Sequence, residues 1–211
     1  DFAETSLSIG KENARLNELP IRPRFVKSDA FPALRQLAGL GQPRMVRGKH
    51  LPPFPKLEPR QFDMVFLETP ANPTMTFTDI GAVSDLARKY CSEKVLVVVD
   101  NTFLGPVFQN PLRFGADVVI YSATKYIGGH SDLIAGVTLV RKAEQIAKIR
   151  EYRTVLGPTI GPDTAWLLTR SLDTIWPRME RHAEKATKVA EALSRHPAIA
   201  NLYLNSGHHR Y

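Results

Sequence analysis

The hydrophobic and polar positions of this chain change their pattern near residue 61. Beyond that point four short apolar runs predict β-strands, at residues 64–69, 95–100, 117–121 and 134–140. The first run is expected to be a buried strand, and the second is apolar on both faces, as in parallel sheets covered by helices. Between these two, residues 79–90 carry apolar side chains at helical spacing. Strands that alternate with helices predict an α/β fold in which a mostly parallel sheet lies between helices.

The pattern becomes helical after the fourth strand. Residues 143–156 predict one helix, which Gly157 closes. Residues 162–171 predict the start of a second helix, with Asp163 as its N-cap. Residues 174–196 predict a long third helix that is rich in Arg, Glu and Lys. We expect this last helix to lead out of the α/β domain.

Three segments divide the chain. Residues 1–60 hold eight of the sixteen prolines and predict an arm or loop segment, because proline disfavours long helices and central strands. Residues 61–173 form the predicted α/β domain, and residues 174–211 form the linking helix and the start of a C-terminal subdomain. Because the chain begins at Asp1 rather than at a methionine, we expect a fragment or a processed product.

Composition narrows the class of protein. The 211 residues are 43% hydrophobic and 23% charged, which is ordinary for a globular protein. No apolar run approaches the ~20 residues of a membrane span, so we expect a cytoplasmic protein without a membrane partner. The single cysteine, Cys91, excludes an internal disulfide and a zinc cluster of cysteines, and we expect no metal and no chemical role for this thiol.

The net charge of +7 raises the question of a nucleic-acid partner. Residues 1–60 carry eleven Lys and Arg against six Asp and Glu, whereas the rest of the chain carries 17 against 15. The excess charge therefore belongs mostly to the N-terminal segment, where it is scattered rather than clustered. This distribution indicates a solvated surface, and we expect no nucleic-acid partner.

Polar side chains stand at the predicted carboxyl ends of three strands. Glu68 follows the first apolar run, Asp100 ends the second, and residues 122–125 follow the third. Ligands of open α/β sheets bind at the carboxyl ends of the strands. These three polar endings therefore predict one shared site.

Lys125 is the first candidate for chemistry at this site. Beside a buried strand end its ammonium is expected to be desolvated, which favours a neutral amine that reacts with carbonyls. Ser122 and Thr124 supply hydroxyl donors, and the glycines at 128–129 allow close backbone approach. This combination suits a phosphate-bearing aldehyde, pyridoxal 5'-phosphate. The alternative is a lysine that simply reaches solvent.

Asp100 and Asn72 each have two interpretations from the local sequence. Asp100 either holds a protonated pyridine nitrogen or caps the turn that follows it through Asn101 and Thr102. Asn72 stands between Pro70 and Pro73 in a rigid turn. It either hydrogen-bonds a ring hydroxyl or a substrate carboxylate, or it stabilises its own turn.

Three separated motifs carry a family resemblance. The runs VFLETPANPTM, VVVDNTF and GADVVIYSATKYIGGHSDLIAG occur in this order around one lysine, and LGPTIGPDTAWLLTRSLDTIWPRMERHAEKATKVAEAL follows them. From about residue 62 to about residue 203 the chain resembles the Cys/Met-metabolism family of pyridoxal-phosphate enzymes, which includes cystathionine γ-synthases, cystathionine lyases and methionine γ-lyases. The resemblance implies the large domain of the aspartate-aminotransferase-like fold, fold type I.

The resemblance also implies roles for individual residues. Lys125 matches the lysine that binds the cofactor aldehyde and moves protons. Asp100 matches the partner of the pyridine nitrogen. The remaining implied cofactor contacts are phosphate ligands, a residue near the ring hydroxyl and two supporting positions: Ser122 and Thr124, Asn72, and Glu68 and Thr102.

The activity that the resemblance implies is elimination from a sulfur amino acid at the γ or β position, in methionine and cysteine metabolism and transsulfuration. Replacement at the γ position is the alternative, and a homo-oligomer, either a dimer or a tetramer, is the implied assembly. Residues 1–60 contain neither the family's glycine-rich phosphate turn nor its ring-stacking tyrosine, and the chain stops at Tyr211 before the family's carboxylate-binding arginine. A truncated, inactive pseudoenzyme that pairs with a full-length relative is therefore a further alternative.

Two other motifs compete for the same residues. Tyr121 and Lys125 have the Y-x-x-x-K spacing of short-chain dehydrogenases, which place both residues on one helix. Here a strand and a glycine-rich loop are expected instead, and no dinucleotide-binding glycine motif occurs near the N-terminus. His130 resembles a general base, but its place after two glycines favours a structural role.

Overall fold

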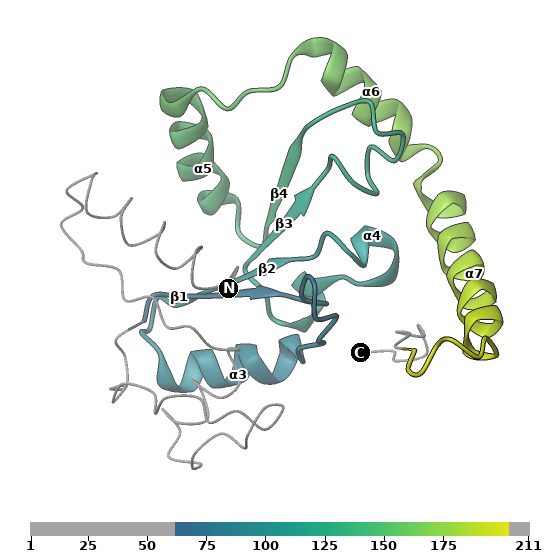
Figure 1. Ribbon diagram of the computed structural model, residues 1–211. Coiled ribbons are helices and arrows are strands. Elements are labelled where there is room, and N and C mark those ends of the chain that lie inside the picture. Colours follow the sequence, from purple (N-terminus) through teal and green to yellow (C-terminus); the bar gives the residue numbers. More distant parts are fainter. Residues whose placement is uncertain (1–61, 203–211) are drawn as a thin grey trace.

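The computed structural model describes residues 62–202 (Figure 1). Its elements, in chain order, are β1 (Met64–Glu68), α3 (Ile80–Tyr90), β2 (Leu96–Asp100), α4 (Gly105–Phe108), the 3-10 helix η1 (Pro111–Phe114), β3 (Val118–Ser122), β4 (Gly136–Val140), α5 (Ala143–Leu156), α6 (Pro162–Leu172) and α7 (Ile175–Ser194). The predicted arm at residues 1–60 and the chain beyond residue 202 lie outside the described residues. The three-segment division of the chain therefore stays a prediction.

The sheet is mixed and mostly parallel, as the sequence predicted. Its four described strands lie in the order β1-β2-β3-β4. Strands β1, β2 and β3 are parallel, and β4 runs antiparallel to β3. In this register Glu68 lies opposite Asp100, and Asp100 lies opposite Ile120, two residues before the end of β3. The polar residues that follow these strands therefore meet at one edge of the sheet.

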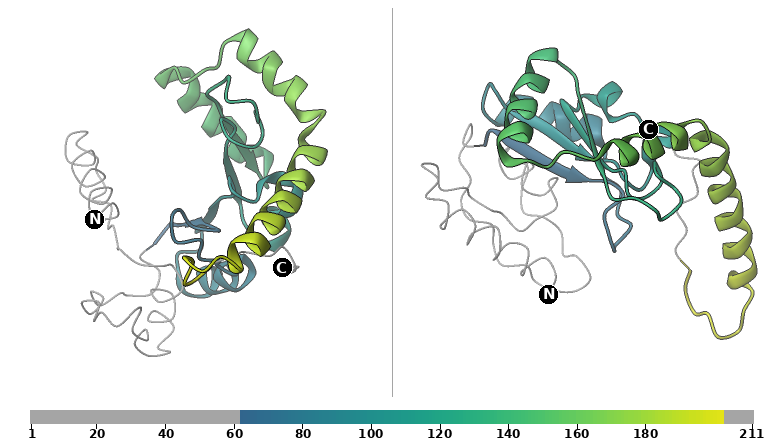
Figure 2. Two further views of the ribbon diagram at one scale, coloured as in Figure 1. Left: turned by 45° about the vertical axis from the view of Figure 1, so that its right-hand side comes forward. Right: turned by 90° about the horizontal axis from the view of Figure 1, so that it is seen from above.

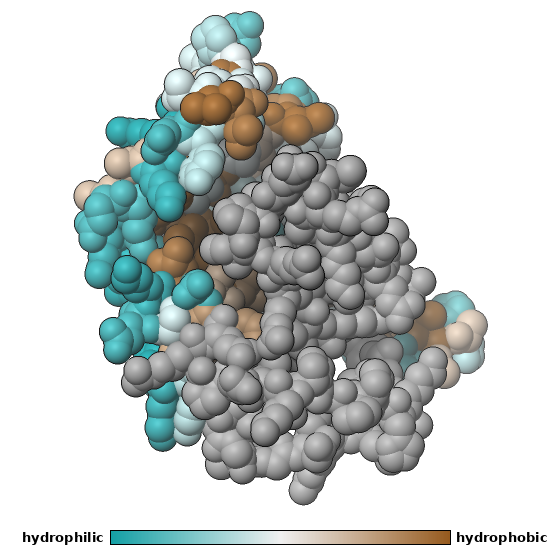
Figure 3. Space-filling view, turned by 90° about the vertical axis from the view of Figure 1, so that its left-hand side faces the viewer, coloured by the Kyte–Doolittle hydropathy of each residue, from teal (hydrophilic) through white to brown (hydrophobic). Residues whose placement is uncertain are grey.

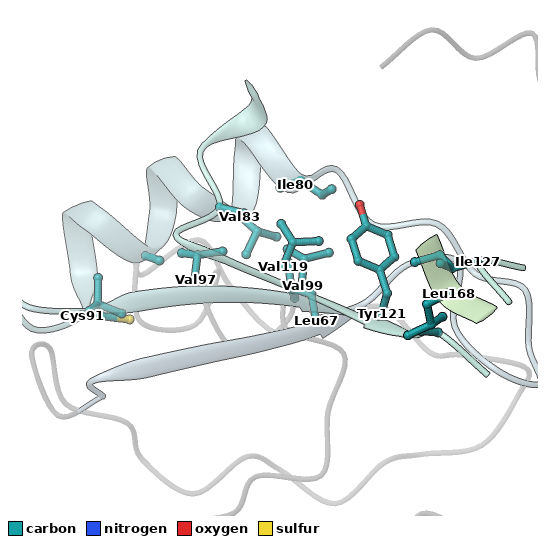
Figure 4. Close-up of a cluster of buried hydrophobic side chains, with 14 of the residues drawn as sticks. Leu67, Ile80, Val83, Cys91, Val97, Val99, Val119, Tyr121, Ile127 and Leu168 are labelled. Atoms are coloured by element: carbon teal, nitrogen blue, oxygen red, sulfur yellow. The ribbon is translucent and has the colours of Figure 1, made fainter. Parts of the chain in front are cut away.

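Helix α3 covers one face of this sheet, and the core lies between them (Figure 4). The Asp79 side chain caps the helix by accepting a hydrogen bond from the Ala82 amide. Most of the apolar positions that predicted the helix are buried against the sheet. Val83 of α3 and Val97 and Val99 of β2 are fully buried. Each such side chain contributes about 1.5–3 kcal/mol through burial.

Strand β1 is less buried than its sequence predicted. Of its five residues only Leu67 is buried, whereas Met64 and Phe66 are 54% and 56% exposed. Within the described residues β1 is one of the two edge strands, and its second face has no helix against it. The prediction of a strand was correct and the prediction of its burial was wrong. Figure 3 shows apolar side chains among hydrophilic ones on one face of the molecule.

The C-terminal helices follow the predicted order. Gly157 closes α5 with a left-handed φ of 79°, as expected. The N-cap of α6 is Gly161 rather than Asp163, which lies in the first helical turn, because Pro162 already occupies the first helical position. Helices α6 and α7 follow one another around the outside of the sheet, and α7 contacts α4 and α6 (Figures 1 and 2). No helix among residues 62–202 combines the length and the hydropathy needed to span a membrane.

Candidate functional site

A cavity of about 700 Å³ opens at the carboxyl edge of the parallel strands. It lies where β1, β2 and β3 end and where the turn after β3 begins. Every residue that the sequence predicted for the site lines this cavity: Glu68, Asn72, Asp100, Thr102, Ser122, Thr124 and Lys125. The prediction that three strand endings converge is confirmed.

Asp100 is half-buried at the end of β2, with one carboxylate oxygen engaged. Its Oδ1 accepts a hydrogen bond of 2.9 Å from the Thr102 amide, so the predicted turn-capping contact is present. No described residue donates a hydrogen bond to its Oδ2. Thr102 in turn accepts a hydrogen bond of 2.8 Å from the Ser122 amide through Oγ1, which joins the end of β2 to the end of β3. The carboxylate therefore has a held orientation and one free oxygen.

The turn that carries Lys125 is tightly folded. The Lys125 amide donates to the Ser122 carbonyl at 3.1 Å, and the Lys125 carbonyl accepts from the Gly129 amide at 2.7 Å. The Lys125 side chain itself is exposed, so the expectation of a buried lysine is wrong. The reason is that β3 ends at Ser122, and the chain has left the sheet by residue 125. Its ammonium forms no ion pair with any described residue, so the amine is accessible.

The two hydroxyls beside Lys125 differ in their contacts. Thr124 Oγ1 donates to the Ala135 carbonyl at 3.3 Å and accepts from the Ala135 amide at 3.0 Å. The Ser122 hydroxyl makes no hydrogen bond within residues 62–202. Ser122 is therefore the more available donor for an anion in the cavity.

Glu68 adds a second carboxylate to the cavity, opposite Asp100 in the sheet register. Although the side chain is classed as exposed, partial burial raises the pKa of Glu68, and the nearby charge of Asp100 raises it further. A hydrogen bond from the Asn72 backbone opposes this rise. Asn72 is thus placed beside Glu68 by the turn between β1 and α3.

Several lining residues were missed in the sequence. Tyr126 and His182 meet edge to face, with ring centroids 5.8 Å apart and an interplanar angle of 67°. His182 comes from α7, far along the chain, so no local pattern links it to the site. The other missed residues surround the lysine turn or follow Asp100: Phe103, Ser131, Leu133 and Ile134. Gly129, which the sequence indicated as a point of close backbone approach, also lines the cavity. Exposed Ile134 was assigned only to a strand in the sequence, whereas β4 begins at Gly136.

The competing motifs do not fit this geometry. Tyr121 lies in β3, is buried, and is absent from the cavity lining. Its hydroxyl accepts a hydrogen bond of 3.2 Å from Asn101 Nδ2, and burial raises the pKa of this phenol. His130 Nδ1 donates to the Gly128 carbonyl at 2.7 Å, which is a structural contact within the turn. The structure supports neither the interpretation of Tyr121 as part of a dehydrogenase motif nor a general-base role for His130.

A match to a family model identifies the class of protein to which the chain belongs. A family model described as "Cys/Met metabolism PLP-dependent enzyme" matches residues 45–209. This match places the chain among the pyridoxal-phosphate-dependent enzymes. Within that class the chain belongs to the Cys/Met metabolism family, as the sequence motifs indicated. The cofactor predicted from the sequence, pyridoxal phosphate, is the cofactor of this family.

Individual relatives agree with this assignment. The chain is 42% identical over 139 residues to a cystathionine gamma-lyase of Bacillus subtilis, covering 66% of this chain and 36% of the relative. It is 48% identical over 141 residues to an L-methionine gamma-lyase of Treponema denticola, covering 66% of this chain and 35% of the relative. The chain therefore spans little more than a third of the length of these relatives.

Solved structures share the fold. A cystathionine gamma-lyase from Lactobacillus plantarum, complexed with L-serine, matches with a TM-score of 0.63 and 37% identity, covering 66% of this chain and 36% of that one. A cystathionine gamma synthase from Xanthomonas oryzae pv. oryzae, in complex with cystathionine, matches with a TM-score of 0.64 and 40% identity, covering 69% of this chain and 38% of that one. The predicted α/β fold of pyridoxal-phosphate enzymes is confirmed.

Proposed function

We propose that this chain carries the cofactor-binding site of a pyridoxal-phosphate-dependent C–S lyase, which acts on sulfur amino acids by γ- or β-elimination. The observation that carries the proposal is the convergence of an accessible lysine, a held carboxylate and two hydroxyls in one cavity. The family membership of the chain gives these groups a common ligand.

The groups in the cavity fit the cofactor chemically. Lys125 supplies an amine for the aldehyde, and Asp100 supplies a carboxylate whose Oδ2 is free for a ring nitrogen. Ser122, and less directly Thr124, supply hydroxyls for the phosphate. Asn72 is assigned to the ring hydroxyl. The Thr102 amide orients the Asp100 carboxylate, and Glu68 is a supporting residue at the same edge of the site.

The chain's own residues then perform two tasks. When bound, pyridoxal phosphate supplies the electron sink that stabilises negative charge at the substrate Cα. Asp100 would hold the ring nitrogen and favour its protonated form, because a neighbouring negative charge stabilises a cation. The Lys125 amine would hold the cofactor aldehyde, and as a free amine it would take the proton from the substrate Cα and return a proton later in the reaction.

Replacement at the γ position is a second candidate activity. It is supported by the similarity to the cystathionine gamma synthase of Xanthomonas oryzae pv. oryzae. A small amino-acid substrate, a homo-oligomeric assembly and a cytoplasmic location complete the proposal. The contrasting candidate is an inactive chain that binds the cofactor, or only pairs with a full-length relative.

A cofactor titration tests the proposal. Purified chain is mixed with pyridoxal phosphate, and the absorbance band of protein-bound cofactor is followed in the wild type, in Lys125→Ala and in Lys148→Ala, a matched exposed lysine on α5. We expect the band in the wild type and in Lys148→Ala but not in Lys125→Ala. Assays for 2-oxo acid and thiol then distinguish a lyase from a chain that binds without turnover. No band in the wild type contradicts the proposed function.

A further inference from the structure

One guanidinium of α7 reaches the turn that carries Lys125. Arg178 donates through Nη1 to the Tyr126 carbonyl at 2.7 Å and through Nη2 to the Ile127 carbonyl at 3.1 Å. The same side chain donates through Nη2 to the Ser171 carbonyl at 2.8 Å and through Nε to Thr174 Oγ1 at 3.1 Å. All of these acceptors are backbone carbonyls or a hydroxyl, and no described residue forms an ion pair with Arg178.

Two of these hydrogen bonds are made next to Lys125 in the chain. Tyr126 and Ile127 are the two residues that follow Lys125, so their carbonyls define the direction in which the chain leaves it. Hydrogen bonds from a charged donor are roughly twice as strong as neutral ones. The planar fork of Arg fixes two adjacent acceptors at once, which the point charge of Lys does not. Arg178 therefore constrains the two peptide groups between residues 126 and 128.

Gly129 shows how closely the guanidinium packs on this turn. A Cβ added at Gly129 would lie 1.9 Å from Arg178 Nη1, so the guanidinium would have to leave its present position. The φ of Gly129 is +74°, so this position also needs a residue that adopts left-handed backbone. The second glycine of the GG pair thus makes room for Arg178.

Arg178 belongs to a small docking face of α7. Buried Met179 packs near Gly105 at the start of α4, and His182 meets the Tyr126 ring. Residues 178, 179 and 182 lie on neighbouring positions of one helical turn. The position of α7 and the position of the lysine turn are thereby coupled through direct contacts.

We propose that Arg178 is a positioning residue for Lys125. Its guanidinium holds the turn at residues 126–129 so that the Lys125 amine meets the cofactor aldehyde in the right direction. The side chain acts through the backbone and touches neither cofactor nor substrate. This inference rests on the proposed function of the site, and it adds a residue that lies 53 positions beyond the lysine.

Cofactor affinity and its pH dependence test this role. The full chain is titrated with pyridoxal phosphate as wild type, Arg178→Met, Arg178→Lys and Arg181→Met, where Arg181 is an exposed arginine of the same helix paired with Glu184. We expect Arg178→Met to raise the Kd for pyridoxal phosphate at least tenfold and to shift the pH midpoint of the bound-cofactor absorbance. Arg178→Lys should recover part of the affinity, and Arg181→Met should stay within twofold of wild type.

The thermal unfolding of each cofactor-free variant separates positioning from folding. A merely structural Arg178 would lower Tm without changing the Kd and pH midpoint of the folded molecules, and that result overturns the inference. A wild-type band with an unchanged Arg178→Met variant overturns this inference alone. A wild type without any band overturns the proposed function and the inference with it.

Gly129→Ala provides a second, independent variant. Its Cβ displaces the guanidinium, so we expect a rise in Kd similar to that of Arg178→Met. In the double variant Gly129→Ala/Arg178→Met the two effects should be less than multiplicative, because the contact is already lost. Fully multiplicative effects would show that the two residues act separately, which contradicts the proposed route.

Discussion

Helices α3 and α7 attach to the same domain in opposite ways. Helix α3 buries an apolar face, including Val83, against the sheet. Helix α7 has 20 residues but buries only Met179 and Ala190, and it reaches the lysine turn through the polar contacts of Arg178. The core and the site therefore depend on different interactions. Apolar burial stabilises the fold, whereas directional hydrogen bonds orient the chemistry.

The sharpest test of this contrast places the same charge in both helices. Val83→Asp puts a carboxylate into the fully buried face of α3, and we expect loss of the folded state, because an unpaired buried charge is costly. Val189→Asp places it at a position of α7 that is 57% exposed, where the free energy of unfolding should change by about 0.5 kcal/mol or less. Circular dichroism during thermal unfolding measures both, and equal losses would contradict the comparison.

The site should respond in the reverse manner. Asp100→Ala removes the carboxylate proposed for the ring nitrogen, and we expect turnover to fall by about a thousandfold or more. Some cofactor should still bind, and Tm should change little, because Asp100 is only half-buried. Product assays and cofactor titration measure these effects, with Asp85→Ala, an exposed carboxylate on α3, as the control. Full turnover in Asp100→Ala would exclude the proposed mechanism.

Asp117→Asn weakens a polar contact of a buried side chain beside β3. The buried Asp117 carboxylate accepts hydrogen bonds from the Val97 amide at 2.8 Å and from Arg88 Nη2 at 2.7 Å. Asp117→Asn keeps an acceptor for Val97 but loses the charge that pairs with Arg88. We expect unfolding to become easier by about 1–3 kcal/mol. Urea unfolding measures this loss, and Asp85→Asn should leave the urea midpoint unchanged. An unchanged midpoint in Asp117→Asn would show that the ion pair adds nothing to the free energy of unfolding.

The smallest expected effect concerns the pH dependence of stability at the site edge. The pKa of Glu68 is raised above its ordinary value of 4.5, so the folded protein holds this proton more tightly than the unfolded chain. The stability contribution is therefore fully present below pH 4.5 and is lost as the pH rises through the folded-state pKa. Urea midpoints measured across this window should fall less in Glu68→Gln than in the wild type. Glu144→Gln, an exposed position in α5, should retain the wild-type slope, and an unchanged slope in Glu68→Gln would contradict the assignment.

Local periodicity explains what the sequence predicted well. Strands β2 and β3 and helix α3 were found because burial requires apolar runs in the strands and helically spaced apolar positions in the helix, and β1 was found from its apolar run although it is mostly exposed. The convergence of Glu68, Asp100 and Lys125 followed from one topological rule about parallel strands. These features depend on residues near one another in the sequence, or on a rule that holds for all such sheets.

Other features depend on contacts that local patterns do not contain. Arg178 and His182 lie about fifty residues beyond the turn that they contact, and nothing in the pattern of α7 distinguishes them from its solvated charges. The exposure of Lys125 depends on the residue at which β3 ends. Moving that end by one residue would change which side chains remain in the sheet. The exposed face of β1 depends on which elements cover it, not on its own composition.

The hydrogen bond between the Ser122 amide and Thr102 Oγ1 joins the end of β3 to the end of β2. Neighbouring strands lie about 4.8 Å apart, and this spacing does not change with side-chain identity. The span from the Asp100 backbone to the start of the lysine turn is therefore set by the sheet itself. Loops around the cavity can therefore differ in sequence, while the spacing between the backbones at the ends of β2 and β3 stays constant.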